Sequence, residues 1–388
     1  MRAAIIPPVN GTLLGGLSAK EFLRRHWQKR PLLVRGALRH CEGLIDLRQL
    51  IRLSGRQDCE SRLVIRERNR WHVEHGPFPP RVFRQLPDRG WTLLVQGVER
   101  FLPAARSLLE LFSFVPHARL DDLMVSYAPP GGGVGPHFDS YDVFLLQARG
   151  HRRWRVSTQR DLELVPDAPL KILRRFRAEG ECTLAPGDML YLPPRLAHDG
   201  IALDDCCTCS IGFRAPAHRE LATEFLAYLE GKLALTGIYA DPGLKPQLHA
   251  ARLPSRMISQ AVQLLDGIRW GRADVVDFLG RYLTEPKPAV TFEPSPPCGT
   301  AAFSRDVRQG GVALAPGSRM LFHGRALFLN GESFRIPGAQ QALFAELADR
   351  RRLSATRTRW PAESMRLLYR WYLDGYILLR GQSTKEWR

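Results

Sequence analysis

The segment from Gly131 to Asp142 contains residues well suited to bind a metal ion. It reads Gly-Gly-Gly-Val-Gly-Pro-His-Phe-Asp-Ser-Tyr-Asp, with His137 and Asp139 two positions apart. On an extended backbone, side chains two positions apart point to the same side, so both can reach one ion. A third donor is His198, which lies just past the end of a predicted strand that stops at Pro193-Pro194. These three residues are candidate metal ligands.

Two imidazoles and one carboxylate leave positions open around a metal, and this donor set is typical of non-haem Fe(II) oxygenases. Two similar patterns, His72-Val73-Glu74 and His218-Arg219-Glu220, lack both the glycine-rich approach and a matching downstream histidine after a strand. We interpret them as surface or helix-capping residues. The full order of turn, His-x-Asp, strand, Pro-Gly-Asp turn, strand and His distinguishes His137 and Asp139.

The elements that must position these ligands are short strands between about residues 60 and 215. Gly/Pro/Asp turns such as Pro129–Gly133 and Ala185–Asp188 separate them. The predicted strands are Arg62–Arg66, Trp71–Glu74, Thr92–Gln96, Leu123–Ala128, Val143–Gln147, Arg152–Val156, Met189–Leu192 and Thr208–Phe213. Many short strands with such turns predict a sandwich or barrel.

The flanking segments follow a helical period. Ser18 and Glu21 predict a capping box at the start of a helix over Ser18–Gln28, and a strand follows at Leu32–Val34. Apolar residues at three- and four-residue spacing predict helices over Arg219–Leu235 and Ser255–Leu283. A proline-rich linker then runs from Glu285 to Pro297.

The last ~90 residues suggest a separate small module. Its predicted strands are Arg319–Phe322, Ala326–Leu329 and Glu332–Ile336, and its predicted helices are Ala339–Asp349 and Ala362–Asp374. This mixture fits a winged-helix-like unit. The expected domains are therefore a catalytic region at 1–215, a helical region with linker at 216–297, and the terminal module at 298–388, giving an α+β protein.

Composition excludes several classes of protein. The chain has 388 residues, of which 44% are hydrophobic and 24% charged, the balance of a folded protein. No apolar run approaches the ~18 residues of a membrane span, and the start Met1–Pro8 is too short and proline-interrupted for a signal peptide. We expect no membrane association and a cytoplasmic location.

The seven cysteines do not form a disulfide pattern. Cys206 and Cys209 form a Cys-x-x-Cys pattern, but no second pair completes a zinc site, so we favour a buried strand.

The net charge of +17 arises mainly from arginine, which makes up 49 of the 56 basic residues. Such a charge could attract nucleic acid, ribosomes or acidic surfaces. The arginines are spread along the whole chain, which favours biased amino-acid usage. We therefore do not predict direct nucleic-acid binding.

The metal-binding block also resembles a known family. His137-Phe-Asp139-x-Tyr141-Asp142-Val143-Phe144-Leu145-x-Gln147, followed by Gly150-x-Arg152-Arg153-Trp154, resembles the cupin/JmjC-type ribosomal oxygenases, and most closely their bacterial branch. The resemblance implies a double-stranded β-helix (cupin/JmjC jelly roll), a helical dimerisation region, a C-terminal winged-helix-like domain and a homodimer. The implied activity is 3-hydroxylation of an arginine in a large-subunit ribosomal protein.

The resemblance also implies which groups bind the cofactor and cosubstrates. His137, Asp139 and His198 would bind Fe(II), with 2-oxoglutarate and dioxygen as cosubstrates. Arg152 would pair with the far carboxylate of 2-oxoglutarate, a role suited to a planar, permanently charged donor. Ser126 would help to hold the same carboxylate. The alternatives are an ordinary outward strand charge for Arg152 and a solvent-facing strand serine for Ser126.

Four further residues match the family's arginine pocket. Asp122 would pair with the substrate guanidinium, Met124 and Tyr141 would enclose its plane, and Ser210 would add a hydrogen bond. Their ordinary interpretations are a turn aspartate, a core methionine, a core tyrosine and a strand serine.

Three other functions stay open from the sequence. The first is an enzyme of the same class with another target, a histidine hydroxylase or a demethylase. The second is a DNA-binding regulator that uses the terminal module and the basic run Arg350–Arg352, with the cupin as a ligand sensor. The third is a cupin with a non-catalytic metal.

Overall fold

The computed structural model describes residues 8–10, 12–39, 41, 43–67, 70–355 and 360–379. The chain folds into two compact units. The first comprises residues 1–215, 286–318 and 351–388, and the second comprises 216–285 and 319–350. The start of the chain, for which we predict no signal peptide, lies almost wholly outside the described residues.

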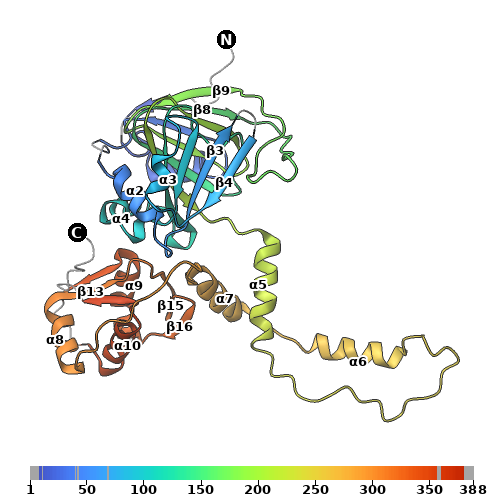
Figure 1. The fold of residues 1–388 in the computed structure, drawn as a ribbon. Coiled ribbons are helices and arrows are strands. Elements are labelled where there is room, and N and C mark those ends of the chain that lie inside the picture. Colours follow the sequence, from blue (N-terminus) through green and yellow to red (C-terminus); the bar gives the residue numbers. More distant parts are fainter. Residues whose placement is uncertain are drawn as a thin grey trace. The chain divides into compact units, whose positions relative to one another are not determined.

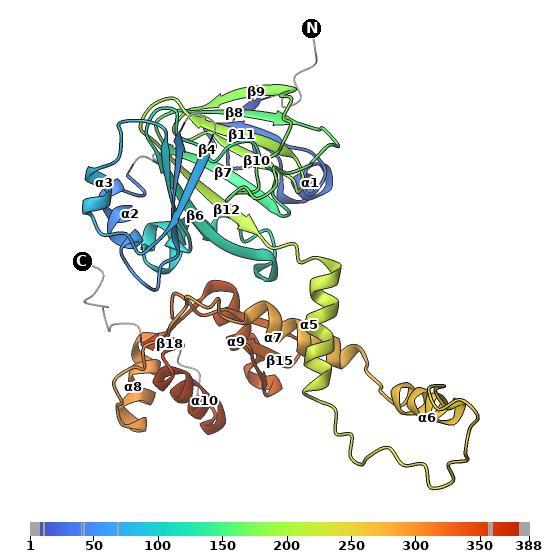
Figure 2. The same cartoon turned by 45° about the vertical axis from the view of Figure 1, so that its right-hand side comes forward.

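The first unit is built around two facing β-sheets (Figures 1 and 2). The large sheet has nine described strands in the order β1 (Pro8–Asn10), β2 (Leu32–Arg35), β10 (Met189–Leu192), β7 (Asp142–Arg149), β12 (Cys206–Phe213), β6 (Leu120–Ala128), β5 (Trp91–Val95), β3 (Ser61–Glu67) and β4 (Arg70–His75). The small sheet has the order β11 (Ala197–Ala202), β8 (Arg152–Ser157) and β9 (Gly180–Leu184). The predicted strands and the jelly-roll architecture are confirmed.

Two apolar cores lie on the two faces of the large sheet. Between the sheets, Val143 and Leu190 of the large sheet pack with Trp154 and Val156 of the small sheet. The outer face is covered by α1 (Ala19–Arg25), α2 (Leu47–Ser54), α3 (Arg81–Arg84) and α4 (Pro103–Glu110), around a core that includes Phe22, Leu50, Phe112 and Phe144. Because both faces of the sheet are covered, the central strands β10 and β12 are buried at every position rather than at alternate positions.

Two sequence predictions about local structure are confirmed. The Ser18 side chain accepts a hydrogen bond from the Glu21 backbone, and the Glu21 side chain accepts one from the Ser18 backbone, so the capping box forms. The Cys206–Phe213 segment is a fully buried strand, and Cys206 and Cys209 are free thiols.

The same unit contains a smaller α/β part near the C-terminus. Its strands are β13 (Gly311–Leu314), β17 (Arg352–Ser354) and β18 (Ile377–Leu379), in the order β17-β13-β18, and its helices are α8 (Thr300–Gly310) and α10 (Ala362–Leu373). Phe303 of α8 packs against Tyr369 and Tyr372 of α10, which holds the two helices together.

The second unit contains α5 (His218–Glu230), α6 (Ser255–Asp266), α7 (Arg272–Thr284), the sheet β14 (Met320–His323), β15 (Ala326–Leu329) and β16 (Glu332–Arg335), and α9 (Gln341–Arg350). The predicted single helix over Ser255–Leu283 is wrong. It breaks between Gly267, which follows α6, and Gly271, which precedes α7, because glycine is the least favourable helix-interior residue after proline.

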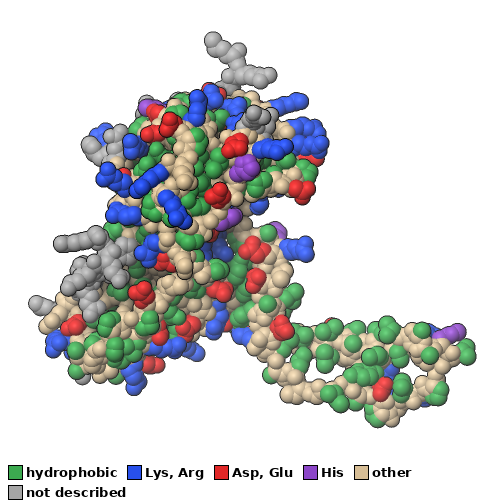
Figure 3. Space-filling view, viewed as in Figure 1, with side chains coloured by type: hydrophobic (Ala, Val, Ile, Leu, Met, Phe, Trp, Pro, Cys, Tyr) green, Lys and Arg blue, Asp and Glu red, His purple; other side chains and the backbone are tan. Residues whose placement is uncertain are grey.

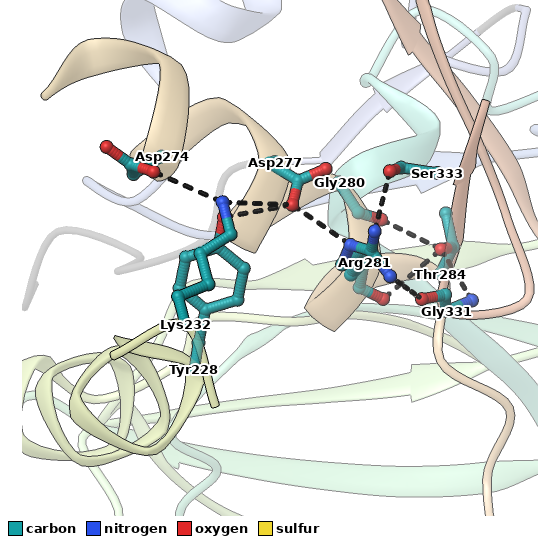
Figure 4. Close-up of polar contacts among 9 residues, drawn as sticks. All are labelled: Tyr228, Lys232, Asp274, Asp277, Gly280, Arg281, Thr284, Gly331 and Ser333. Atoms are coloured by element: carbon teal, nitrogen blue, oxygen red, sulfur yellow. Dashed lines mark hydrogen bonds and ion pairs between the residues drawn. The ribbon is translucent and has the colours of Figure 1, made fainter. Parts of the chain in front are cut away.

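Polar contacts hold α7 between α5 and the β15–β16 hairpin (Figure 4). The Tyr228 hydroxyl of α5 donates to Asp277 at 2.9 Å. Arg281 donates to Asp277 at 3.0 Å and to the Ser333 hydroxyl of β16 at 2.7 Å. One carboxylate therefore ties together two helices and, through Arg281, the hairpin.

The described part of the chain contains no helix that is long and apolar enough to cross a membrane.

Candidate functional site

The three predicted metal ligands lie on paired backbone segments. His137 sits on an extended segment after the glycine-rich turn, and His198, past the end of β10 as predicted, lies inside β11. Their backbones exchange two hydrogen bonds, His137 N to His198 O at 2.9 Å and His198 N to His137 O at 2.8 Å. Asp139 is fixed by its carbonyl, which accepts from the Arg195 backbone at 2.7 Å.

The ligand atoms of the three residues converge. One atom from each of His137, Asp139 and His198 lies within 4.8 Å of the others. His198 Nε2 is 3.6 Å from Asp139 Oδ2, and the two imidazole centroids are 4.2 Å apart. This cluster is the one such group of histidine, cysteine or carboxylate residues found among the described residues, so His72 and His218 lie in no comparable cluster.

Both imidazoles are oriented for metal binding by backbone carbonyls. His137 Nδ1 lies 2.8 Å from Gly135 O, and His198 Nδ1 lies 2.9 Å from Leu196 O. Since a carbonyl only accepts, each Nδ1 carries the proton and each Nε2 keeps its lone pair. Such carbonyl contacts fix ring orientation in metal sites generally.

Burial also favours the neutral ring at His198. Burial, followed by the charge of the neighbouring His137, lowers the pKa of His198 to about 4 against the opposing effect of Asp139. A neutral imidazole is the form that binds a metal, so the donor set present here fits an Fe(II) ion.

The glycines of the approach turn allow this close pairing. A Cβ on Gly133 would lie 2.5 Å from the carbonyl oxygen of Gly200 in β11. Any side chain there would push the turn away from the strand that carries His198.

Arg152 is a buried cation on β8 with an unsatisfied donor. Its residue is 5% exposed, its Nη2 has no hydrogen-bond partner, and its Nε donates to Cys206 Sγ at 3.4 Å. In contrast, Arg155 projects to the other side of β8 and pairs with Asp199 of β11. Arg152 is therefore not a solvent-exposed strand charge. A buried guanidinium with a free donor fits the carboxylate of an acidic small molecule.

Ser126 lies on β6 beside Thr208 of β12. It is 3% exposed, and its hydroxyl lies 3.5 Å from the Thr208 carbonyl. The solvent-facing alternative for this serine is thus wrong.

Three of the four predicted pocket residues lie on the paired strands β6 and β12, and Tyr141 directly precedes β7. Asp122 and Met124 are two apart on β6, so they share a face, and Ser210 of β12 is the cross-strand partner of Met124. Asp122 and Ser210 are buried, whereas Tyr141 is 36% exposed. Desolvation of the Tyr141 hydroxyl, followed by the charges of Asp139 and Asp122, raises its pKa above the ordinary value.

Two charged residues near Asp122 were missed from the sequence. Lys287 Nζ lies 2.9 Å from both Asp121 Oδ1 and Asp122 Oδ2. Glu99 accepts from the Leu123 backbone at 3.0 Å, and burial, followed by the charge of Asp122, raises its pKa to about 7. Lys287 is 165 positions from Asp122 within a proline-rich segment, so no local pattern could have shown this contact.

Comparison with protein families identifies two regions. Residues 107–221 match the JmjC domain, and residues 266–377 match a ROXA-like winged helix. The first region contains the metal ligands, Arg152 and the four pocket residues.

Individual relatives agree with these matches. The chain is 34% identical over 325 residues to the ribosomal protein uL16 3-hydroxylase of Escherichia coli K12, covering 83% of this chain and 86% of that protein. It is 42% identical over 207 residues to a probable ribosomal oxygenase of Haemophilus influenzae, covering 52% and 50%. The solved structure of the E. coli ribosomal oxygenase YcfD in complex with cobalt and 2-oxoglutarate superposes with a TM-score of 0.80 at 31% identity, covering 94% of this chain and 98% of that one. This chain belongs to the family of JmjC-type ribosomal oxygenases.

Proposed function

We propose that this protein is an Fe(II)- and 2-oxoglutarate-dependent hydroxylase that adds a hydroxyl group to the β-carbon of an arginine in a large-subunit ribosomal protein. The observation that carries this proposal is the His137–Asp139–His198 cluster, which shares a barrel with the buried and incompletely bonded Arg152. The uL16 3-hydroxylase of E. coli makes uL16 the first substrate to test.

The proposed cofactor and cosubstrates each have a group to hold them. His137, Asp139 and His198 would hold Fe(II) through one atom each, leaving positions open for the keto-acid end of 2-oxoglutarate and for dioxygen. Arg152 would bind the far carboxylate through its free Nη2, with Ser126 beside it. When bound, the metal lets dioxygen oxidise 2-oxoglutarate to succinate and carbon dioxide while the second oxygen atom enters a substrate C–H bond.

The residues of this chain would orient the substrate arginine. Asp122 supplies a buried carboxylate for the guanidinium, and Met124 and Tyr141 supply surfaces for its plane. Ser210 lies across from Met124 and offers a hydroxyl. A guanidinium fixed at this end would leave the β-carbon as the part of the side chain to be presented to the metal.

The direct test is incubation of the purified protein with Fe(II), 2-oxoglutarate and candidate ribosomal proteins. We expect one substrate, uL16, to gain the mass of one oxygen atom, and fragmentation should place it on an arginine. Hydroxylation of a histidine instead would refute the arginine assignment while leaving the oxygenase assignment intact. Absence of 2-oxoglutarate turnover with every substrate would refute the oxygenase assignment.

The role of Asp122 can be separated from that of the metal. Asp122→Ala should impair hydroxylation of an arginine peptide yet leave slow, uncoupled succinate release, because the metal ligands and Arg152 are unchanged. An Arg→Lys peptide should react very poorly with the wild type, since a site built for a hydrogen-bonded group can reject an analogue lacking it by ~10⁴-fold. Normal hydroxylation by Asp122→Ala would show that the pocket is misassigned.

We also propose that residues 216–284 form a homodimer interface. Large apolar side chains of the segment 233–270 are exposed in the single chain, among them Ile238 at 94%, Leu248 at 92% and Leu265 at 60%. In Figure 3, green hydrophobic side chains lie along this segment, including α6. α6 has no buried residue, so its apolar face is available to a second copy. A monomer by light scattering at micromolar concentration would refute this proposal.

We also propose a cytoplasmic location, which the ribosomal protein substrate of the E. coli relative supports. The domain limits 1–215, 216–297 and 298–388 likewise remain predictions, to be tested by limited proteolysis.

A further inference from the structure

Lys287 forms ion pairs with the carboxylates to which the proposed substrate guanidinium would bind. Its Nζ bridges Asp121 and Asp122 at 2.9 Å each, and the side chain of Asp122 is only 10% exposed. Burial by itself would lower the pKa of Lys287, but Asp122 and Asp121 together raise it above the ordinary value. The ammonium is therefore bound as a cation.

The backbone around Lys287 is held in place for this contact. Prolines 286 and 288 flank it and restrict the local backbone. Two residues further on, the Ala289 carbonyl accepts from Arg100 Nη1 at 3.3 Å. Arg100 Nη2 in turn donates to the Asp58 carbonyl at 2.8 Å, so the segment is attached to the barrel. Lys287 is thus presented to the two aspartates at a high effective concentration.

The charge balance explains why a cation is needed there. Asp121 and Asp122 are adjacent carboxylates, and Glu99 lies behind them with a pKa raised partly by Asp122. Without a counter-ion the two aspartates would repel each other in a partly buried position. Lys287 and an arriving arginine would each supply one positive charge, so they compete for the same carboxylates.

We propose that Lys287 is a specificity-determining residue, which holds the substrate's cation site in the free enzyme and must be displaced by the arginine. This inference rests on the proposed function of Asp122. A guanidinium can displace it because its planar fork binds a carboxylate through two hydrogen bonds and is less strongly hydrated than an ammonium. A lysine in a peptide offers the same group as Lys287 without the advantage of attachment, so it is rejected.

The kinetic test compares Lys287→Met with the wild type on an arginine peptide from uL16. An occupant that prefers the bound position by about ten to one raises the apparent dissociation constant about tenfold. We therefore expect KM to fall about tenfold in Lys287→Met and to rise in Lys287→Arg, whose guanidinium would compete better. The matched control is Lys20→Met, which removes an equal charge from an exposed residue of α1 and should change KM less than about twofold.

Specificity gives a second readout. The Arg→Lys form of the same peptide should bind Lys287→Met measurably better than it binds the wild type. An unchanged or increased KM for the arginine peptide in Lys287→Met would overturn the proposal, because it would mean that Lys287 does not compete or that it helps to hold Asp122.

Amine labelling tests the same contact without turnover. In the full-length protein, Lys287 should react with an acylating reagent more slowly than Lys20, as measured by peptide mass spectrometry. Arginine amide at increasing concentration should raise its reactivity. If Lys287 reacts like Lys20, or if arginine amide has no effect on it, the proposal fails.

The two levels of inference can fail separately. If the wild type hydroxylates no arginine peptide but arginine amide still exposes Lys287, the proposed substrate is wrong and the cation exchange stands. If arginine is hydroxylated but Lys287 is never protected, the substrate stands and the specificity role of Lys287 is wrong.

Discussion

Replacement of Arg152 by methionine should weaken 2-oxoglutarate binding while leaving the ligand-free protein at least as stable. The guanidinium is 5% exposed, its Nη2 has no partner, and its Nε meets only a thiol sulfur among the described contacts. A bound carboxylate would complete these bonds, whereas in the free protein the buried charge meets only the Cys206 sulfur and the Trp154 ring, 5.9 Å from the guanidinium carbon. Methionine keeps an unbranched apolar stem and carries no charge, so it removes both the binding group and the unfavourable burial of the guanidinium.

The size of the effect follows from the burial of Arg152. Loss of one partner from a buried ion pair costs about 3–5 kcal/mol, which is roughly a 150- to 5,000-fold loss of affinity. Titration calorimetry of 2-oxoglutarate into protein loaded with a redox-inactive divalent metal measures this directly. Urea denaturation of the metal-free protein measures the second expectation, an unchanged or increased free energy of unfolding.

The neighbouring arginines provide controls on the same strand. Arg153 and Arg155 are partly exposed, and Arg155 already pairs with the buried Asp199. Arg155→Met should therefore destabilise the fold, because Asp199 loses its partner, with less than about 1 kcal/mol of effect on 2-oxoglutarate binding. Equal losses of affinity at Arg152, Arg153 and Arg155 would refute the assignment of the cosubstrate anchor.

Four further outcomes are expected. Asp139→Ala should abolish 2-oxoglutarate turnover with an unchanged circular dichroism spectrum, since it removes one of three ligands, and full succinate release would contradict the metal site. The pKa of Glu99 is about 7 in the folded protein against an ordinary value of 4.5, so the folded state binds this proton more tightly than the unfolded state. The free energy of unfolding should therefore fall as pH rises from 4.5 to 7. Glu99→Gln should flatten this decline, as measured by urea titrations at several pH values. Ile258→Glu on the exposed face of α6 should convert a dimer to a monomer by light scattering. Gly280→Ala should lower stability by about 1–3 kcal/mol in urea, because a Cβ there would collide with the Phe328 ring.

Local sequence signals predicted most of the elements but not all of their limits. The capping residues predicted the start of α1, and the apolar runs between prolines and glycines predicted the strands that carry Arg152 and Ser210. β6 begins at Leu120, so the predicted strand from Leu123 left out Asp122. β11 was missed because Ala197–Ala202 contains one β-branched residue, Ile201, and its strand character comes from pairing with β8. The segment Ser255–Leu283 kept its helical period across Gly267–Gly271, where the helix breaks.

The candidate site was predictable where it depends on spacing and unpredictable where it depends on tertiary contact. The two-residue spacing of His137 and Asp139 and the third histidine after a Pro-Gly-Asp turn were enough to identify a converging ligand set. The contact of Lys287 with Asp122 joins residues 165 positions apart, and no periodic pattern encodes it. The sequence also could not distinguish the buried Arg152 from the partly exposed Arg155 three residues later. That difference comes from the packing of β8 against the large sheet.

Arg152, which would bind 2-oxoglutarate, and Asp121 and Asp122, which would bind the substrate arginine, differ in whether another group already holds them. Arg152 is a cation without a carboxylate partner among its described contacts, so 2-oxoglutarate meets no competitor and satisfies an open donor. Asp121 and Asp122 already hold Lys287, so a substrate arginine must exchange one cation for another and gains only the difference between them. Cosubstrate affinity should therefore depend on a single buried charge, and peptide affinity on the contrast between a guanidinium and an ammonium. That contrast depends on the geometry of the two cations, which suits an enzyme that must select one arginine of a ribosomal protein.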